Sequence, residues 1–226
     1  MIKEFAFGLS NRHHFADAGD MQKYSNMAQD TFMSLYDYDS HVVDYVKKNH
    51  TLSSYDGMLY MPSEYILDVD GSNSEEARQA AIGLTILLDD LCIPYQPYFS
   101  GTGFHLGIPE SAFRWRPAPD LHLRVKDEMK AQGIYEYADA SVSDKTRLIR
   151  IVNTLNGKSK LWKIPLKPSE LHGSVDNILA LAKTSRAKFD YNDAVLENEC
   201  EPIFDVLKRK TVASDKKFET VTLGRN

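Results

Sequence analysis

The chain has 226 residues, a hydrophobic fraction of 42% and a formal net charge of -5, which excludes a protein that is basic overall. This length is typical of one large domain, or of one domain with an appendage. Its two cysteines, Cys92 and Cys200, are too few for a disulfide scaffold or a cysteine-rich zinc site, so no structural zinc is expected. The sequence begins without an apolar signal segment, and no run approaches the roughly 18 apolar residues of a membrane span. We therefore expect a cytoplasmic protein with no membrane partner.

The first half of the chain contains predicted helices and one pair of predicted strands. Residues 20–50 have a mixed composition and predict helices, the clearest over residues 40–50. Apolar and aromatic residues over 57–61 and 65–70 predict two neighbouring strands. A helix follows, since Ser72 and Glu75 fit a capping box and apolar residues then recur at helical spacing as far as residue 91.

Strands and helices continue to alternate in the second half. Two strands are predicted over residues 95–100 and 104–109, on either side of the sequence SGTG. The remaining predicted elements are an amphipathic helix at 120–132, strands at 147–153 and 160–166, and a helix at 174–183. This order predicts an α+β fold with a mixed α/β arrangement rather than a helical bundle.

Asp68 and Asp70 are the first candidate site residues. They end the predicted strand over 65–70, and residues i and i+2 of a strand point to the same face. At 4 Å, two such charges repel by about 4 kcal/mol at an effective dielectric near 20. Either water solvates the pair at a turn or a cation lies between the two carboxylates.

The second candidate feature is the sequence SGTGFH, which contains Ser100, Gly101, Gly103 and His105. Two glycines and two small hydroxyl residues allow backbone N–H groups to face an anion, as phosphate-binding loops do. A glycine-containing hairpin turn explains the same residues, because a short glycine-rich turn is a weak motif. Both interpretations stay open at this point.

A third candidate carboxylate and a basic segment follow. Asp139 precedes a predicted strand, where an aspartate is either a further ligand or an ordinary turn residue. Residues 145–167 contain no acidic residue and seven basic ones, which are Lys145, Arg147, Arg150, Lys158, Lys160, Lys163 and Lys167. A strip of one sign indicates a polyphosphate or nucleic-acid backbone as partner, and a chance cluster is the alternative.

Together these features predict phosphoryl or nucleotidyl transfer. Carboxylates that bind divalent cations neutralise phosphate charge, and arginine and lysine side chains bind the triphosphate. A metal between Asp68 and Asp70 would also turn their mutual repulsion into attraction.

The same residues resemble the archaeo-eukaryotic primase superfamily, in its primase small-subunit and primase-polymerase members of phage or plasmid type. LDVDG resembles the first motif of that family, SGTGFHLGIP the second, and DASVSDKTRLIRIVNTLNGKSKLWKIPL the third. The order and approximate spacing of the three agree across residues 57–167. The resemblance implies an RRM-like catalytic sheet packed with a smaller α/β unit and flanking helices.

The resemblance also implies roles for individual residues. Asp68, Asp70 and Asp139 would be catalytic and would bind two divalent ions, Mg²⁺ or Mn²⁺. The residues implied to bind the nucleotide are Ser100, Gly101, Gly103, His105, Arg150 and Lys158. Residues 1–186 would form the catalytic domain, and residues 187–226 an extension or linker toward a further domain.

The activity implied is template-dependent primer synthesis on single-stranded DNA from NTPs or dNTPs, with a replicative helicase or helical primase domain, fused or separate, as a further partner. Two other classes remain open. A metal-dependent glycosyltransferase explains Asp68 and Asp70 but gives no role to His105, Asp139 or the basic segment. A non-catalytic module that binds single-stranded nucleic acid explains the basic segment but not the carboxylates.

Overall fold

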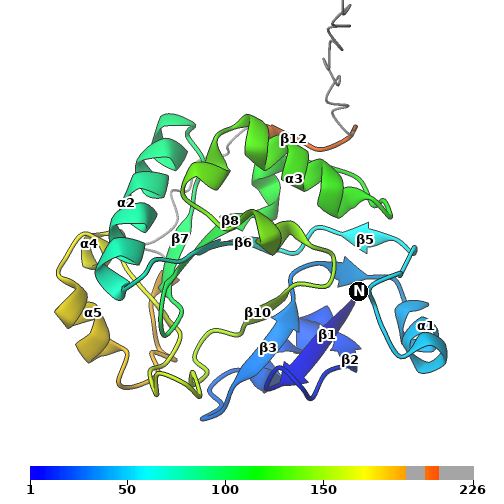
Figure 1. The fold of residues 1–226 in the computed structure, drawn as a ribbon, viewed down its shortest axis with the longest axis horizontal. Coiled ribbons are helices and arrows are strands. Elements are labelled where there is room, and N and C mark those ends of the chain that lie inside the picture. Colours follow the sequence, from blue (N-terminus) through cyan, green and yellow to red (C-terminus); the bar gives the residue numbers. More distant parts are fainter. Residues whose placement is uncertain (192–201, 209–226) are drawn as a thin grey trace, which may run out of the picture.

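Two antiparallel sheets form the body of the protein in a computed structural model, which describes residues 1–191 and 202–208 (Figure 1). In the first sheet the strand order is β10-β3-β1-β4-β5, and β2 also pairs with β1. Its strands are β1 (Ile2–Phe7), β2 (His14–Asp17), β3 (Thr31–Ser34), β4 (Asp37–Tyr38), β5 (Leu59–Tyr60) and β10 (Leu148–Arg150). The N-terminal residues therefore share a sheet with a strand from the third sequence motif.

The second sheet carries the first two motifs. Its strands are β6 (Glu64–Val69), β7 (Gln96–Phe99), β8 (Phe104–Pro109) and β11 (Ile164–Pro165), in the order β11-β7-β8-β6. The register of β6 on β8 places Asp68 opposite His105, and His105 in turn lies opposite Tyr98 of β7. Strand pairing thus brings the first and second motifs into contact.

Helices cover the outer side of the second sheet, away from the first sheet (Figure 1). The α-helices are α1 (Val42–Asn49), α2 (Ser74–Asp90), α3 (Leu121–Ala131), α4 (Pro168–Leu171) and α5 (Val175–Leu181). Short 3₁₀ helices are η1 (Ala18–Tyr24), η2 (Glu110–Ala112), η3 (Ile134–Glu136) and η4 (Ala140–Ser143). No helix in these described stretches is long and apolar enough to cross a bilayer.

Helix α2 shows how the sequence pattern produces this packing. Its buried face includes Ala77, Leu84 and Leu88, which repeat at the spacing of one helix face. The cap differs from the predicted one, because Asn73 rather than Ser72 accepts from the first-turn N–H groups. Asn73 has the extended backbone of an N-cap, so the helix begins at the next residue.

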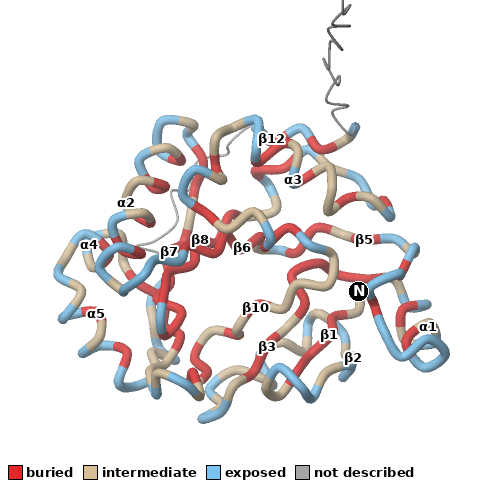
Figure 2. The backbone as a smooth tube through the Cα atoms, in the orientation of Figure 1, coloured by how far each residue is buried: buried red, intermediate tan, exposed pale blue. Residues whose placement is uncertain are grey.

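The mixed α+β class is confirmed, and the buried strands of both sheets run through the centre of the molecule (Figure 2). Helices were predicted over residues 20–50, yet β3 and β4 lie there beside η1 and α1. Strand β1 was missed because four consecutive residues are buried, two of them charged. Lys3 pairs with Asp37 at 2.6 Å and Glu4 with Arg12 at 2.8 Å, which satisfies both charges inside the sheet.

Part of the predicted C-terminal extension returns to the body. Strand β12 (Phe204–Asp205) pairs in parallel with β9 (Phe113–Arg114), and the side chain of Phe204 is fully buried. The boundary at residue 186 stays a prediction. The frayed end predicted over residues 212–226 lies outside the described residues.

Candidate active site

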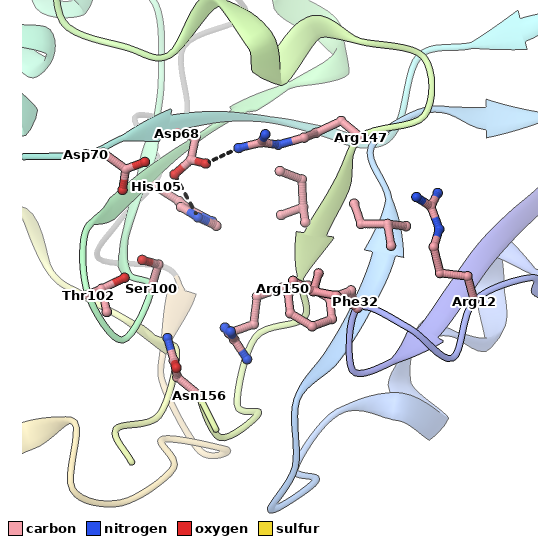
Figure 3. Close-up of a pocket in the computed structure, with 13 residues that line it drawn as sticks. Arg12, Phe32, Asp68, Asp70, Ser100, Thr102, His105, Arg147, Arg150 and Asn156 are labelled. Carbon is pink, nitrogen blue, oxygen red and sulfur yellow. Dashed lines mark hydrogen bonds and ion pairs between the residues drawn. The ribbon is translucent and has the colours of Figure 1, made fainter. Parts of the chain in front are cut away.

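A cavity of about 500 Å³ lies where the two sheets face each other (Figure 3). Three groups of side chains line it. The acidic end has Asp68 and Asp70 with His105 against Asp68, and the opposite wall has Ser100, Thr102, Arg150 and Asn156. The first sheet and the segment leading into β10 complete the lining with Leu9, Arg12, Phe32, Arg147, Leu148 and Ile149. All three sequence motifs therefore open into one cavity.

Backbone contacts bring the third aspartate to the first two. The backbone N–H of Asp139 donates to the backbone carbonyl of Asp68 at 2.8 Å, which fixes the start of η4 against the end of β6. The Asp139 carboxylate also caps η4 by accepting from the N–H of Ser141 at 2.8 Å. Asp139 is therefore both the capping residue of η4 and a neighbour of Asp68.

One arginine joins two of the three carboxylates. Nη2 of Arg147 lies 2.7 Å from Oδ2 of Asp68 and 3.5 Å from Oδ2 of Asp139. Burial alone raises the pKa of Asp68, but His105 and Arg147 outweigh it and hold that pKa well below its usual range. Asp68 is therefore a carboxylate at neutral pH.

The environment of Asp70 shifts its pKa in the opposite direction from that of Asp68. Partial burial, followed by the negative charges of Asp68 and Asp139, raises the pKa of Asp70 above its usual value. Its carboxylate makes no hydrogen bond or ion pair within residues 1–191 and 202–208. The site thus carries negative charge that the described side chains do not fully balance.

His105 is held between an acid and a base. Nε2 of His105 lies 3.3 Å from Oδ1 of Asp68, and Nζ of Lys163 lies 2.9 Å from Nδ1. Burial, together with the charge of Lys163, lowers the pKa of His105 to about 4, so the ring is neutral at pH 7. Because the Asp68 carboxylate can only accept, Nε2 carries the proton that faces it, and Nδ1 accepts from Lys163. Both ring nitrogens are engaged, and the phosphate contact predicted for His105 stays a prediction.

The SGTG sequence is the turn between β7 and β8. Gly101 has a φ of +103°, and a Cβ on it would lie 2.7 Å from Cβ of Asn156. A Cβ on Gly103 would lie 2.6 Å from the carbonyl oxygen of Val69. Both glycines are therefore required for the close approach of this turn to β6 and to Asn156.

This hairpin turn also leaves donors free. Ser100 and Gly103 bond each other, through a backbone bond of 2.9 Å and a side-chain bond of 3.1 Å. The N–H groups of Gly101 and Thr102 have no partner in the part of the chain that the structure describes. Since Ser100 and Thr102 line the cavity, the turn offers backbone donors to an anion there.

Arg150 supplies the positive charge of this wall, and residues outside the predicted motifs hold it in place. Its Nη1 pairs with Asp30 and donates to the carbonyl of Leu155 at 3.2 Å. The guanidinium also lies 4.6 Å from the centre of the Phe32 ring. Asp30 in turn accepts from the N–H of Gly157 at 2.9 Å, so one carboxylate positions both Arg150 and the turn after it.

The basic segment over residues 145–167 is not one continuous surface, contrary to its sequence interpretation. Arg147 and Arg150 are ion-paired, Lys163 is 2% exposed, and Lys145 donates to the carbonyl of Tyr55 at 2.7 Å. Lys158 is exposed and does not line the cavity, so its predicted phosphate contact stays a prediction. The cations point in different directions because the segment is mostly turns around two short strands.

The donors at the acidic end suit a hard divalent cation. Mg²⁺ and Mn²⁺ prefer oxygen ligands, and three carboxylates gather here with a guanidinium beside two of them as a stand-in cation. In the arrangement seen, no three acidic, imidazole or thiol groups of the described stretches converge closely enough to hold an ion. Arg147 lies between Asp68 and Asp139, where such an ion would have to enter.

Comparison with known proteins finds similarity in structure but not in sequence. No protein-family model matches the chain, and no curated protein matches its sequence. Among solved structures, the chain is similar to the polymerase domain of Ligase D from Mycobacterium tuberculosis in complex with DNA, with a TM-score of 0.43 and 16% sequence identity. The match covers 67% of this chain and 58% of that one, so this chain spans less than two thirds of the polymerase domain.

Most of the predicted site residues come together around this cavity. It is lined by Asp68, Asp70, Ser100, His105 and Arg150, with Asp139 beside Asp68. Sequence reasoning missed Asp30, Arg147 and Lys163 as individual contributors, because their partners are 127, 79 and 58 residues away in the chain.

Proposed function

We propose that this chain is a template-dependent nucleotidyltransferase, a DNA primase or primase-polymerase that starts strands on single-stranded DNA. One observation carries the proposal: Asp68 and Asp70 line one end of a cavity, with Asp139 beside Asp68, and Ser100, Thr102 and Arg150 line the opposite wall. Nucleotidyl transfer requires these two environments side by side, because the α-phosphate reacts while the β- and γ-phosphates are held.

The proposed reaction is an in-line displacement. The oxygen of a 3′-hydroxyl loses its proton to water and forms a bond to the α-phosphorus of a nucleoside triphosphate, the bond from that phosphorus to the β-phosphate oxygen breaks, and pyrophosphate leaves. Mg²⁺ or Mn²⁺, bound by Asp68, Asp70 and Asp139, would neutralise phosphate charge and lower the pKa of the attacking hydroxyl.

The chain's own residues supply position and charge. Arg150 and the free N–H groups of Gly101 and Thr102 would bind the β- and γ-phosphates, which become the pyrophosphate. His105 orients Asp68 through Nε2, while its Nδ1 accepts from Lys163. The same proposal includes a DNA template, NTPs or dNTPs as substrates, a helicase or helical primase partner and a cytoplasmic location.

A primer-synthesis gel tests this function. The full chain is incubated with single-stranded DNA, labelled NTPs or dNTPs and Mg²⁺ or Mn²⁺, without an added primer. The wild type should make extended products, Asp70→Asn should make none, and Asp44→Asn should match the wild type. Asp44 is a suitable control because its side chain is 86% exposed on α1. An Asp70→Asn variant that synthesises as well as the wild type would falsify the assignment, as would transfer from a UDP-sugar in place of an NTP.

A further inference from the structure

Arg147 occupies the centre of the acidic end of the cavity. Its Nη2 lies 2.7 Å from Asp68 and 3.5 Å from Asp139, and its Nη1 lies 3.3 Å from Oγ of Ser141. Figure 3 shows the guanidinium reaching along the cavity to Asp68. A single cationic group therefore contacts two carboxylates that the proposed reaction needs for a metal.

The backbone of Arg147 is fixed, while its side chain has room to move. Its carbonyl accepts from the N–H of Leu35 at 2.9 Å, and its N–H donates to the carbonyl of Asp144 at 3.0 Å. The side chain itself is 31% exposed and lines the cavity. Rotation of the side chain alone could thus carry the guanidinium away from Asp68 without disturbing β10.

A guanidinium and a divalent ion compete for these carboxylate oxygens. Mg²⁺ binds carboxylate oxygens at about 2.0–2.1 Å and requires a near-octahedral shell, whereas Nη2 of Arg147 already contacts Oδ2 of Asp68. The two cations would also repel each other at that distance. Binding of an ion between Asp68 and Asp139 therefore competes with the Arg147 contacts.

We propose that Arg147 is a cationic placeholder for the metal. In the metal-free protein it neutralises Asp68 and Asp139 and keeps the two carboxylates facing each other. Metal binding displaces its guanidinium into the cavity, where it faces the phosphates of the nucleotide. Asp70, which lacks an ion-pair partner in residues 1–191 and 202–208, makes the first contact with the incoming ion. This inference rests on the proposed function, since it takes the metal role of the three aspartates as given.

Mn²⁺ affinity tests the competition directly. Binding is measured by electron paramagnetic resonance of free Mn²⁺ for the wild type, Arg147→Gln and the control Lys158→Gln. Arg147→Gln should bind Mn²⁺ about ten-fold more tightly, because the competing cation is removed. Lys158→Gln removes an exposed positive charge close to the same cavity and should change the affinity less than about two-fold.

Thermal unfolding gives a second readout that does not depend on activity. Without metal, Arg147→Gln should melt below the wild type, because Asp68 and Asp139 then face each other without a counter-charge. Saturating Mn²⁺ should raise the melting temperature of Arg147→Gln more than that of the wild type, so that the two proteins melt at nearly the same temperature. Arg147→Lys keeps the charge and should bind Mn²⁺ nearly as the wild type does.

The outcomes separate this inference from the proposed function. Mn²⁺ binding that is lost in Asp70→Asn but equal or weaker in Arg147→Gln overturns the placeholder role alone. A wild type that binds no Mn²⁺ contradicts the metal site, and with it the proposed function. If Arg147→Gln does not fold, the Nε resonance of Arg147 in the wild type is followed by NMR while Mg²⁺ is added. A shift supports displacement, and an unchanged resonance at saturating Mg²⁺ overturns it.

Discussion

At the scale of single residues, Asp68 lies on β6 and Asp70 lies directly after its end, and their surroundings shift their pKa values in opposite directions. Asp68 is buried but paired with His105 and Arg147, which hold its pKa well below the usual range. Burial and the charges of Asp68 and Asp139 raise the pKa of Asp70. Charge at Asp68 therefore stabilises the fold, while charge at Asp70 opposes it.

This contrast predicts opposite effects of one substitution at the two positions. Asp68→Asn should lower the free energy of unfolding by about 1–3 kcal/mol, because it leaves a charged guanidinium with a weaker partner in a buried site. Asp70→Asn should leave that free energy unchanged or raise it by less than about 1 kcal/mol, since the group is only partly buried and water screens it. Urea unfolding of both variants at pH 7 measures the difference, and equal destabilisation of the two would contradict it.

The buried side chain of Lys163 should make the free energy of unfolding depend on pH. Burial lowers the pKa of Lys163 to about 7, so between about pH 7 and 10 the unfolded chain holds a proton that the folded chain has released. The free energy of unfolding should therefore rise with pH across this window, by at most about 1.4 kcal/mol per pH unit for one proton. Lys163→Met should flatten the slope in urea titrations at pH 7, 8 and 9. A variant with the slope of the wild type would show that Lys163 is protonated throughout.

At the scale of elements, the turn between β7 and β8 depends on glycine in two separable ways. Gly101 has a positive φ, and a side chain there would also strike Asn156, whereas Gly8 has a φ of +76° with nothing within 4 Å. Gly8→Ala should thus cost about 1 kcal/mol for backbone strain alone. Gly101→Ala should cost about 1–2 kcal/mol more and should weaken nucleotide binding. Chemical denaturation of both variants tests this, and equal losses would remove the steric component.

The elements that the sequence predicts well are those with a local signal. Helix α2 and the β7–β8 hairpin follow from helical spacing and from strands on either side of a glycine turn. The first sheet carries no such signal, since β1 buries consecutive residues and pairs its charges with distant partners. The apolar spacing of α2 favours a buried thiol at Cys92, yet that residue is exposed and has a φ of +54°.

At the scale of the whole molecule, the site exists because two sheets face each other. The three motifs predicted Asp68, Asp70, Asp139, His105 and Arg150 around one site, and the structure brings these residues together. Contributions from the first sheet could not be predicted, because they depend on how the sheets pack rather than on any local pattern. Asp30, in the segment before β3, is the main example.

Asp30 should therefore affect nucleotide binding more than chemistry. Asp30→Asn weakens the hold on Arg150 and on the backbone of Gly157, so the Michaelis constant for the nucleotide should rise about ten-fold while kcat changes little. Asp20→Asn is the matched control, because Asp20 pairs with the exposed Lys23 on η1. Steady-state primer extension separates the two constants, and an Asp30→Asn variant with an unchanged Michaelis constant would contradict this role.

The most direct test of the central claim is the anomalous scattering of Mn²⁺ in crystals of the protein grown with a non-hydrolysable nucleoside triphosphate. The account predicts a peak bound by the carboxylates of Asp68, Asp70 and Asp139, with phosphate density between that peak and Arg150. A peak elsewhere, or an Asp139 carboxylate turned away from the ion and from the nucleotide, would contradict it.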